Sequence, residues 1–358
     1  MRFVRVPSRT SAEFAVKAGI ATIIAIGTAR VIGLNSPYWA GISAVVATAG
    51  TLGASINAAV MRIVATVIAL LIAIGVVLLP VDGLAVAGIT VSVTLLIMSS
   101  LNLEAGAKLA GASTLLLTAI PQGDPLSTAI GRGLNVPLGC IVAVAVGLVI
   151  FPRRAVTGLR IGMTEDFVGS FRLTAEALEH WLDSTTSPQL THRLNALLDD
   201  VAKRETAYAE ASYEPSGIGD RSADLLQALF LTARLSRICR SVLIVTEKFS
   251  EDSIQRLLES EFRTVIEALH TAISDIDEQI WLNTAKFSLE VAAVLKPATT
   301  RLDQGFRRLR SGRETAPFSD SEVEHLLHVM WCIHRLSEAL HEASDGNGPI
   351  GSNSGRPL

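Results

Sequence analysis

The chain has 358 residues, 49% of them hydrophobic, and its 31 Lys and Arg residues are slightly outnumbered by 34 Asp and Glu residues. A net charge of −3 with no Lys/Arg-rich face excludes the basic footprint of a nucleic-acid-binding protein. Three cysteines lie far apart, without the paired spacing of a metal site or a disulfide framework, and we expect no metal and no cofactor.

The charged residues are distributed very unevenly along the chain. Residues 31–151 contain six charged side chains, whereas residues 152–358 contain 53 of the chain's 65. A helix needs about 20 apolar residues to cross a bilayer. We therefore predict an all-α protein with a transmembrane domain over residues 1–152 and a cytoplasmic α-helical domain over 153–343. The tail 344–358, rich in Gly, Ser, Asn and Pro, is predicted to be disordered.

Six apolar segments, separated by Pro, Gly and charged residues, predict six transmembrane spans. The spans are expected at Ala12–Leu34, Pro37–Ile56, Arg62–Leu79, Gly83–Leu101, Ala105–Ile120 and Leu126–Phe151. The fifth is short and rich in Gly and Ala, a composition that is tolerated where a segment is buried by protein rather than by lipid.

The connections between these segments alternate between basic and neutral. Lys and Arg occur in the N-terminal segment, at the second connection, after the fourth and after the last span, and are absent from the other connections. Because cytoplasmic connections carry the excess of Lys and Arg, both termini are predicted to lie in the cytoplasm, which places the protein in the inner membrane.

Beyond Pro152 the apolar residues recur every three or four positions, as expected for amphipathic helices. Breaks are expected at Ser187-Pro188, at 215–219, at Lys296-Pro297 and at Ala316-Pro317, which gives a bundle of five or six helices. Alternating β-branched runs are scarce, so a sheet is not expected.

Two spans begin alike. Arg62 is followed by Thr66 and Ala69, and Arg132 is followed by Val136 and Gly139 at the same spacings. This echo indicates a three-plus-three inverted repeat, a plan that recurs in transport proteins with their sites at the repeat interface. Chance similarity between two segments rich in Val, Ala and Ile is the alternative.

Five stretches within residues 12–154 form a recognisable pattern: Lys17-Ala18-Gly19, Leu34-Asn35-Ser36-Pro37-Tyr38-Trp39-Ala40, Gly53-Ala54-Ser55, Arg62-Ile63-Val64-Ala65-Thr66 and Arg132 through Gly139 to Pro152. These stretches resemble the fusaric acid resistance (FUSC) or aromatic acid exporter superfamily, which is related to the plant aluminium-activated malate transporters. Lys17, Ala65 and Ala69 stand where the family usually has Arg, Gly and Gly. The resemblance implies a homodimeric membrane protein that moves organic anions and has a helical cytoplasmic domain.

Charged side chains inside a bilayer cost a few kcal/mol each, so those that are retained there are candidate functional residues. Arg132 lies within the last span, with Asn135 one turn further on, and its guanidinium group suits a carboxylate. The alternatives for Arg132 are that it reaches to the interface or pairs with Asp124. Arg62 is expected near the cytoplasmic end of its span, either in the anion path or as an ordinary positive-inside anchor.

Two further residues are candidates for the anion path. Lys108 at the start of the fifth span either faces the path or neutralises Glu104, one turn away. Trp39 either stacks on an aromatic substrate or anchors the helix at the membrane interface.

The expected function is the export of organic anions, in particular aromatic carboxylates, across the membrane. The alternative is a membrane-anchored scaffold whose helical domain binds a protein partner. An enzyme is not expected, because the spans contain no histidine and no serine–histidine or paired-aspartate arrangement.

Overall fold

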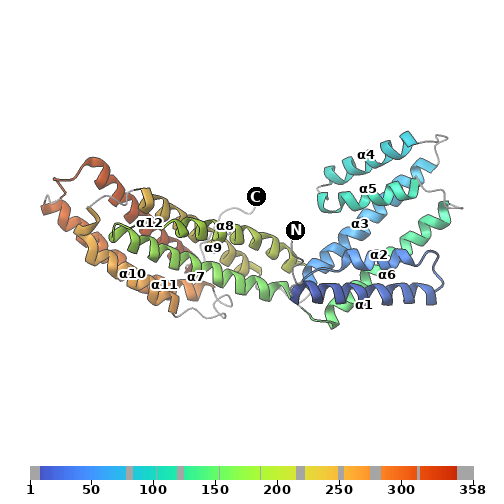
Figure 1. The fold of residues 1–358 in the computed structure, drawn as a ribbon, viewed down its shortest axis with the longest axis horizontal. Helices are drawn as coiled ribbons and strands as arrows, with labels where there is room; N and C mark the ends of the chain where they lie inside the picture. The colour runs from blue at the N-terminus through green and yellow to red at the C-terminus, as the bar shows by residue number, and fades with distance from the viewer. Residues whose placement is uncertain are drawn as a thin grey trace, which may run out of the picture. The chain divides into compact units, whose positions relative to one another are not determined.

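The computed structural model describes residues 9–77, 84–101, 103–118, 125–152, 154–185, 187–214, 222–248, 254–274, 284–312 and 315–344. All regular structure in these ranges is helical, as predicted (Figure 1). The chain divides into two compact units, one formed by Met1–Ala155 with Glu210–Gly217 and the other by Val156–Ala209 with Ile218–Leu358. The predicted disordered tail lies outside the described residues beyond residue 344.

The first unit contains six described helices that follow the six predicted apolar segments. They are α1 (Arg9–Val31), α2 (Tyr38–Ala47), α3 (Leu52–Val77), α4 (Leu84–Ser100), α5 (Glu104–Thr118) and α6 (Pro125–Val149). Helices are the expected form here, since every backbone N–H and C=O must find a partner inside an apolar segment.

Three described helical segments are long and apolar enough to cross a membrane: Arg9–Val31, Leu52–Gly75 and Ile130–Val149. The other apolar helices of the unit are shorter, and α2 has only 10 residues and α5 only 15. The six crossings therefore stay a prediction, whereas the three long helices fit a membrane protein directly.

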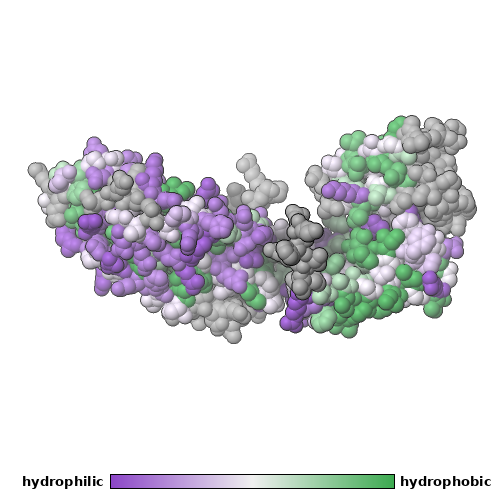
Figure 2. Space-filling view, in the orientation of Figure 1, coloured by the Kyte–Doolittle hydropathy of each residue, from purple (hydrophilic) through white to green (hydrophobic). Residues whose placement is uncertain are grey.

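The first unit has its small residues inside and its large aliphatic residues outside. Its core between α1, α2 and α6 is made largely of alanines, among them Ala21, Ala25, Ala40 and Ala44. Large side chains on several of its helices are exposed instead, such as Ile23, Leu71, Leu96, Ile141 and Val149. The visible face of this unit is predominantly hydrophobic in Figure 2. Such a surface suits contact with lipid, because soluble proteins rarely expose apolar patches of this extent.

The predicted ends of the second and third spans are wrong. The second helix ends at Ala47 rather than Ile56, and the third begins at Leu52 rather than Arg62. Thr48 adopts an extended backbone, and the Thr51 hydroxyl accepts a hydrogen bond from the Ala54 N–H at the start of α3. Arg62 is therefore a residue within a helix, although its charge suggests a connection.

A carboxylate from a distant part of the chain accepts hydrogen bonds from the N-terminal amides of two helices. One oxygen of Glu214, which is buried, accepts hydrogen bonds from the N–H of Gly53 in α3 (3.3 Å) and of Ala155 in α7 (2.6 Å). The nearby Glu210 accepts a hydrogen bond from the Thr51 hydroxyl at 3.1 Å. Negative charge at helix N-termini is favourable, since those amides lack partners in their own helix.

The second unit is a set of amphipathic helices with a conventional aliphatic and aromatic core. Its elements are α7 (Ala155–Leu182), α8 (Pro188–Ser212), α9 (Ser222–Lys248), a 3-10 turn (Ile254–Leu258), α10 (Glu259–Ser274), α11 (Thr284–Gly312) and α12 (Asp320–Ser344). Trp181, Phe167, Phe171 and Phe262 are fully buried, and the visible outer face is mainly hydrophilic (Figure 2).

The predicted helix break at Lys296-Pro297 is wrong, because α11 continues through Pro297. Val291 and Leu295 before the proline and Ala298 and Leu302 after it are all buried. A proline removes one backbone hydrogen bond from a helix. The apolar packing on both sides offsets that loss and keeps the helix continuous.

Candidate functional site

The site is centred on a buried arginine of the first unit. Arg132 lies two turns into α6 and is 3% exposed. Its guanidinium carbon lies 3.6 Å from the centroid of the Trp39 ring, which is a close cation–π contact. One terminal nitrogen of the same group donates a hydrogen bond to the Ser113 carbonyl of α5 at 3.0 Å. Three helices, α2, α5 and α6, thus hold one cation.

Several polar atoms of Arg132 and of neighbouring residues on α2 and α6 are buried and have no hydrogen-bond partner. They are Nε and Nη2 of Arg132, Nε1 of Trp39, Oδ1 of Asn135 and Oγ of Ser43. The amide nitrogen of Asn135 donates to the carbonyls of Asn35 (2.8 Å) and Gly131 (2.7 Å), which leaves its oxygen unused. Buried donors without partners are rare and costly, so this group is suited to receive a polar ligand.

A close approach of two backbones brings these side chains together. An added Cβ at Gly139 of α6 would lie 2.1 Å from the Ala40 carbonyl oxygen of α2. Only glycine leaves room for this contact, and Trp39 and Ser43 flank Ala40 on α2. This contact sets α2 against α6, and Arg132, seven residues or about two turns earlier on α6, meets the Trp39 ring.

Arg62 is the second buried cation of the unit. It is 5% exposed, and its Nε has no hydrogen-bond partner. It lies ten residues after the start of α3, or about 15 Å along the helix axis. Cys140 and Arg132, both on α6, lie within electrostatic range of Arg62. The expectation that Arg62 sits at the helix end is thus wrong, because it is buried within α3, a helix that packs against α6.

The predicted site residues are therefore only partly brought together. Arg132, Trp39 and Asn135 form one group, and Arg62 is buried nearby on α3. Lys108 is exposed on α5, outside this group, and its part in an anion path stays a prediction. Pairing of Arg132 with Asp124 involves a residue outside the described ranges. No described carboxylate lies within ion-pair distance of Arg62 or Arg132.

Sequence reasoning missed one side chain and two backbone carbonyls of the site, and one further buried cation of the unit. Ser43 follows Trp39 by one helical turn, a spacing that signals a shared face of α2. The Ser113 and Asn35 groups that contact the site are backbone carbonyls, which carry no sequence signal. Lys17, buried on α1, is a further cation of this unit.

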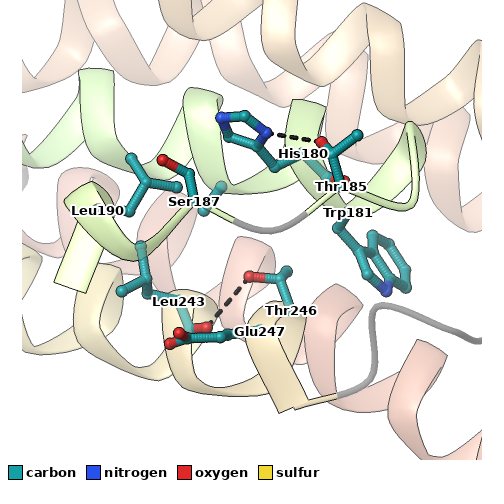
Figure 3. A pocket seen from close by; sticks show the side chains of 9 residues that line it. His180, Trp181, Thr185, Ser187, Leu190, Leu243, Thr246 and Glu247 are labelled. Carbon is teal, nitrogen blue, oxygen red and sulfur yellow. Dashed lines mark hydrogen bonds between the residues drawn. The ribbon is translucent and has the colours of Figure 1, made fainter.

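The second unit contains a small pocket at the turn between α7 and α8. His180, Trp181, Thr185 and Ser187 line it together with residues of α9 (Figure 3). The His180 Nδ1 and the Thr185 Oγ1 lie 2.7 Å apart across its edge. Its volume of ≈ 20 Å³ is enough for about one water molecule, so it is too small for an organic ligand. No group of three or more His, Cys, Asp or Glu residues suited to a metal occurs among the described residues.

Three helices long and apolar enough to cross a membrane, exposed aliphatic side chains and two buried arginines are features of a membrane protein with polar groups inside its apolar unit. Residues 11–351 match the fusaric acid resistance protein family (FUSC), so the chain belongs to that family. The match extends well beyond residues 12–154 and includes the helical second unit. Proteins of this family are typically membrane transporters rather than enzymes. A comparison with curated proteins gives no match.

Proposed function

We propose that this protein is a transporter or channel that exports organic anions, most of all aromatic carboxylates. The observation that carries the proposal is the Arg132 guanidinium, which is buried on Trp39 with two nitrogens unpartnered and no described carboxylate beside it. An unpaired cation in an apolar environment is strongly unfavourable, and an arriving anion removes that cost.

The chemistry of the site supports a planar carboxylate. Nε and Nη2 of Arg132 are two neighbouring donors of one guanidinium edge, the arrangement that pairs with both oxygens of a carboxylate. The free N–H of Trp39 adds a donor on the ring that Arg132 contacts, and the unpartnered Ser43 hydroxyl lies one turn further along α2. An aromatic substrate fits beside Trp39, since its ring can stack on the indole.

A three-plus-three inverted arrangement is part of the proposal, and the helix contacts support it. If the first repeat is α1–α3 and the second is α4–α6, each pair of helices that pack together in one repeat should have a corresponding packed pair under the exchange of α1 with α4, α2 with α5 and α3 with α6. The principal helix contacts of the unit obey this rule. For example, α1–α2 becomes α4–α5, α2–α6 becomes α5–α3, and α3–α6 maps onto itself. Under this exchange Arg62 and Arg132 occupy corresponding helices. The anion path then runs between α3 and α6, with one arginine on each.

The remaining parts of the proposal concern location and energy. The protein lies in the inner membrane with both termini in the cytoplasm, and the distribution of Lys and Arg supports this orientation. It forms a homodimer, as the family resemblance implies. No phosphate-binding glycine loop of the GxxxxGK[ST] type occurs in the sequence. An anion that leaves a cell with a negative interior moves down the electrical gradient, which is worth about 2.3 kcal/mol per charge at 100 mV.

Transport activity is tested with the purified full chain in liposomes loaded with labelled 4-hydroxybenzoate. Release faster than from protein-free liposomes, and inhibition by other aromatic carboxylates, is the expected result. Malate in place of the aromatic acid tests the substrate class. If no carboxylate leaves faster than from empty liposomes, and the second unit retains a protein partner when attached to an unrelated anchor, the scaffold alternative replaces this proposal.

A further inference from the structure

The second unit contains a larger groove, formed between α9 and α12. Its cavity has a volume of ≈ 170 Å³. Arg234, Arg237, Ile238 and Ser241 line it from α9, and Trp331, Cys332 and Arg335 from α12. Arg234, Arg237 and Ser241 are three or four positions apart on α9, and Trp331 and Arg335 are four apart on α12, so each of these sets lies on one helix face. Three arginines thus converge on one groove in a half of the chain whose net charge is negative.

The three arginines differ in the partners they already have. Arg234 is paired with Glu342, and Arg335 is paired with Glu338 at 2.8 Å. Arg237 is exposed, and its Nε donates to the Ala233 carbonyl at 3.0 Å. Among the described residues, no carboxylate lies within ion-pair distance of Arg237. Its two terminal nitrogens are therefore available to an anion.

An aromatic surface borders the same groove. Trp331 is 56% exposed, although most other large apolar side chains of this unit are buried. The Arg335 guanidinium carbon lies 5.9 Å from the Trp331 ring centroid, and the His328 ring meets the indole edge-on at 5.8 Å. These contacts hold the indole beside the arginines and leave much of it uncovered, which is suited to stacking.

We propose that the α9–α12 groove binds a single-ring aromatic carboxylate, with its carboxylate on Arg237 and its ring against Trp331. Arg234 and Arg335 add positive charge on either side of the carboxylate. A cavity of about 150 Å³ accommodates one benzene molecule, so this groove has room for one substituted ring. The assignment follows from the size, the free guanidinium group and the exposed indole together.

This site is separate from the buried cluster around Arg132, and its occupancy does not depend on transport. Binding in the groove without any flux would overturn the proposed transport function and leave this inference standing. Flux without binding in the groove would do the reverse. The two proposals therefore fail independently.

The test uses the full chain in detergent, with 5-fluorotryptophan incorporated and the Trp331 resonance assigned from a Trp331→Phe sample. Benzoate is titrated to about 10 mM, ten times a dissociation constant of about 1 mM that suits a small ligand. We expect a saturable shift of the Trp331 resonance. Arg237→Ala weakens binding about tenfold or more, because one charged hydrogen-bonding group is lost.

Two matched variants show that the effect is specific. Arg240→Ala removes an exposed arginine of α9 that does not line the groove, and benzoate binds it as it binds the wild type. Arg132→Ala removes the buried membrane-unit cation and leaves the Trp331 shift unchanged. A Trp331 resonance that ignores benzoate overturns the proposal. A Trp331 resonance that shifts equally with benzoate and with inorganic phosphate also overturns it. The same holds if the resonance shifts only with protein concentration, as it would at a dimer contact.

Discussion

At the scale of single residues, the contact between Trp39 and Arg132 combines the two features on which the proposed function depends. The indole ring replaces part of the hydration that the guanidinium group loses inside the apolar unit. The ring also leaves two nitrogens of Arg132 open. The same pair can therefore hold a positive charge in place and recognise a flat anion.

The Trp39→Leu variant tests this dual role. Loss of a partly desolvated cation–π contact costs about 1–2 kcal/mol, so we expect aromatic carboxylate export to fall several-fold to about tenfold. Trp39→Phe retains an aromatic face and should lose less. Initial rates in liposomes with equal amounts of protein give the comparison. Equal rates for the Leu and Phe variants would contradict a stacking role.

Glu214 is predicted to stabilise the first unit by capping two helices. In Glu214→Ala the amides of Gly53 and Ala155 lose their common acceptor, and unsatisfied buried amides cost about 1–3 kcal/mol each. Glu214→Gln keeps an acceptor oxygen and loses only the charge. Thermal unfolding in detergent should place the Gln variant between the wild type and the Ala variant. A Gln variant as unstable as the Ala variant would show that charge, not hydrogen bonding, is responsible.

A buried ion pair in the second unit gives a pH-dependent prediction. Asp166 is 3% exposed and accepts two hydrogen bonds from Arg204, at 2.8 and 3.1 Å. Burial raises the pKa of the Asp166 carboxyl, and Arg204 opposes that rise. Arg204→Ala leaves the carboxylate buried without its partner, at a cost of about 3 kcal/mol at neutral pH.

The sign of this pH dependence follows from the raised pKa. A pKa that is higher in the folded than in the unfolded state means that the folded protein binds the proton more tightly. The loss of stability caused by the buried carboxylate is therefore complete at pH values above the folded-state pKa, and it disappears as the pH falls toward the unfolded-state pKa. The variant is thus expected to regain stability relative to the wild type on acidification. Amide exchange in α7 and α8 measures this, and a difference that grows toward acid pH would contradict it.

At the scale of helices, the packing of α2 on α6 determines where Trp39 lies relative to Arg132. In Gly139→Ala the new methyl group would lie 2.1 Å from the Ala40 carbonyl oxygen, so the helices must separate. Gly147 is on the same helix, and an added Cβ there meets nothing within 4 Å. We expect Gly139→Ala to lose most transport and to cost about 1–3 kcal/mol of stability.

Gly147→Ala is the matched control for this experiment. It should transport like the wild type and be equally or slightly more stable, because alanine favours helix formation by up to about 1 kcal/mol. Transport rates and unfolding temperatures of the two variants are measured side by side. Normal transport by Gly139→Ala would show that the close contact is not needed for the site.

The sequence permits prediction of six apolar helices in the first unit because a long apolar run has one favourable backbone form in lipid. Their limits are less predictable where a charge is buried. Arg62 suggests a connection, yet α3 begins ten residues earlier at a threonine cap. Pro297 suggests a break, yet apolar contacts on both sides keep α11 continuous.

The site was predictable to the extent that it uses side chains that are unusual in an apolar segment. Arg132, Asn135 and Trp39 stand out for that reason, and the structure brings them together. The Ser113 carbonyl and the close contact at Gly139 depend on helix packing. The groove on α9 and α12 depends on the register of two helices nearly 100 residues apart, which periodicity alone does not provide.

At the scale of the whole molecule, the chain combines an apolar unit that contains unpaired buried cations with a hydrophilic helical unit that has its own cationic groove. We propose that the first unit moves an organic anion and that the second unit binds an anion of related chemistry. Both units lie within the region that matches the fusaric acid resistance protein family.

The most direct measurement is the initial rate of 4-hydroxybenzoate release from liposomes that contain Arg132→Ala, with Arg30→Ala as control. Arg30 is an exposed arginine at the end of α1, and its loss should leave the rate unchanged. Loss of the charged hydrogen bonds of Arg132 should lower the rate of the first variant at least tenfold. An Arg132→Ala protein that is correctly folded and exports the anion as fast as the wild type would contradict the account.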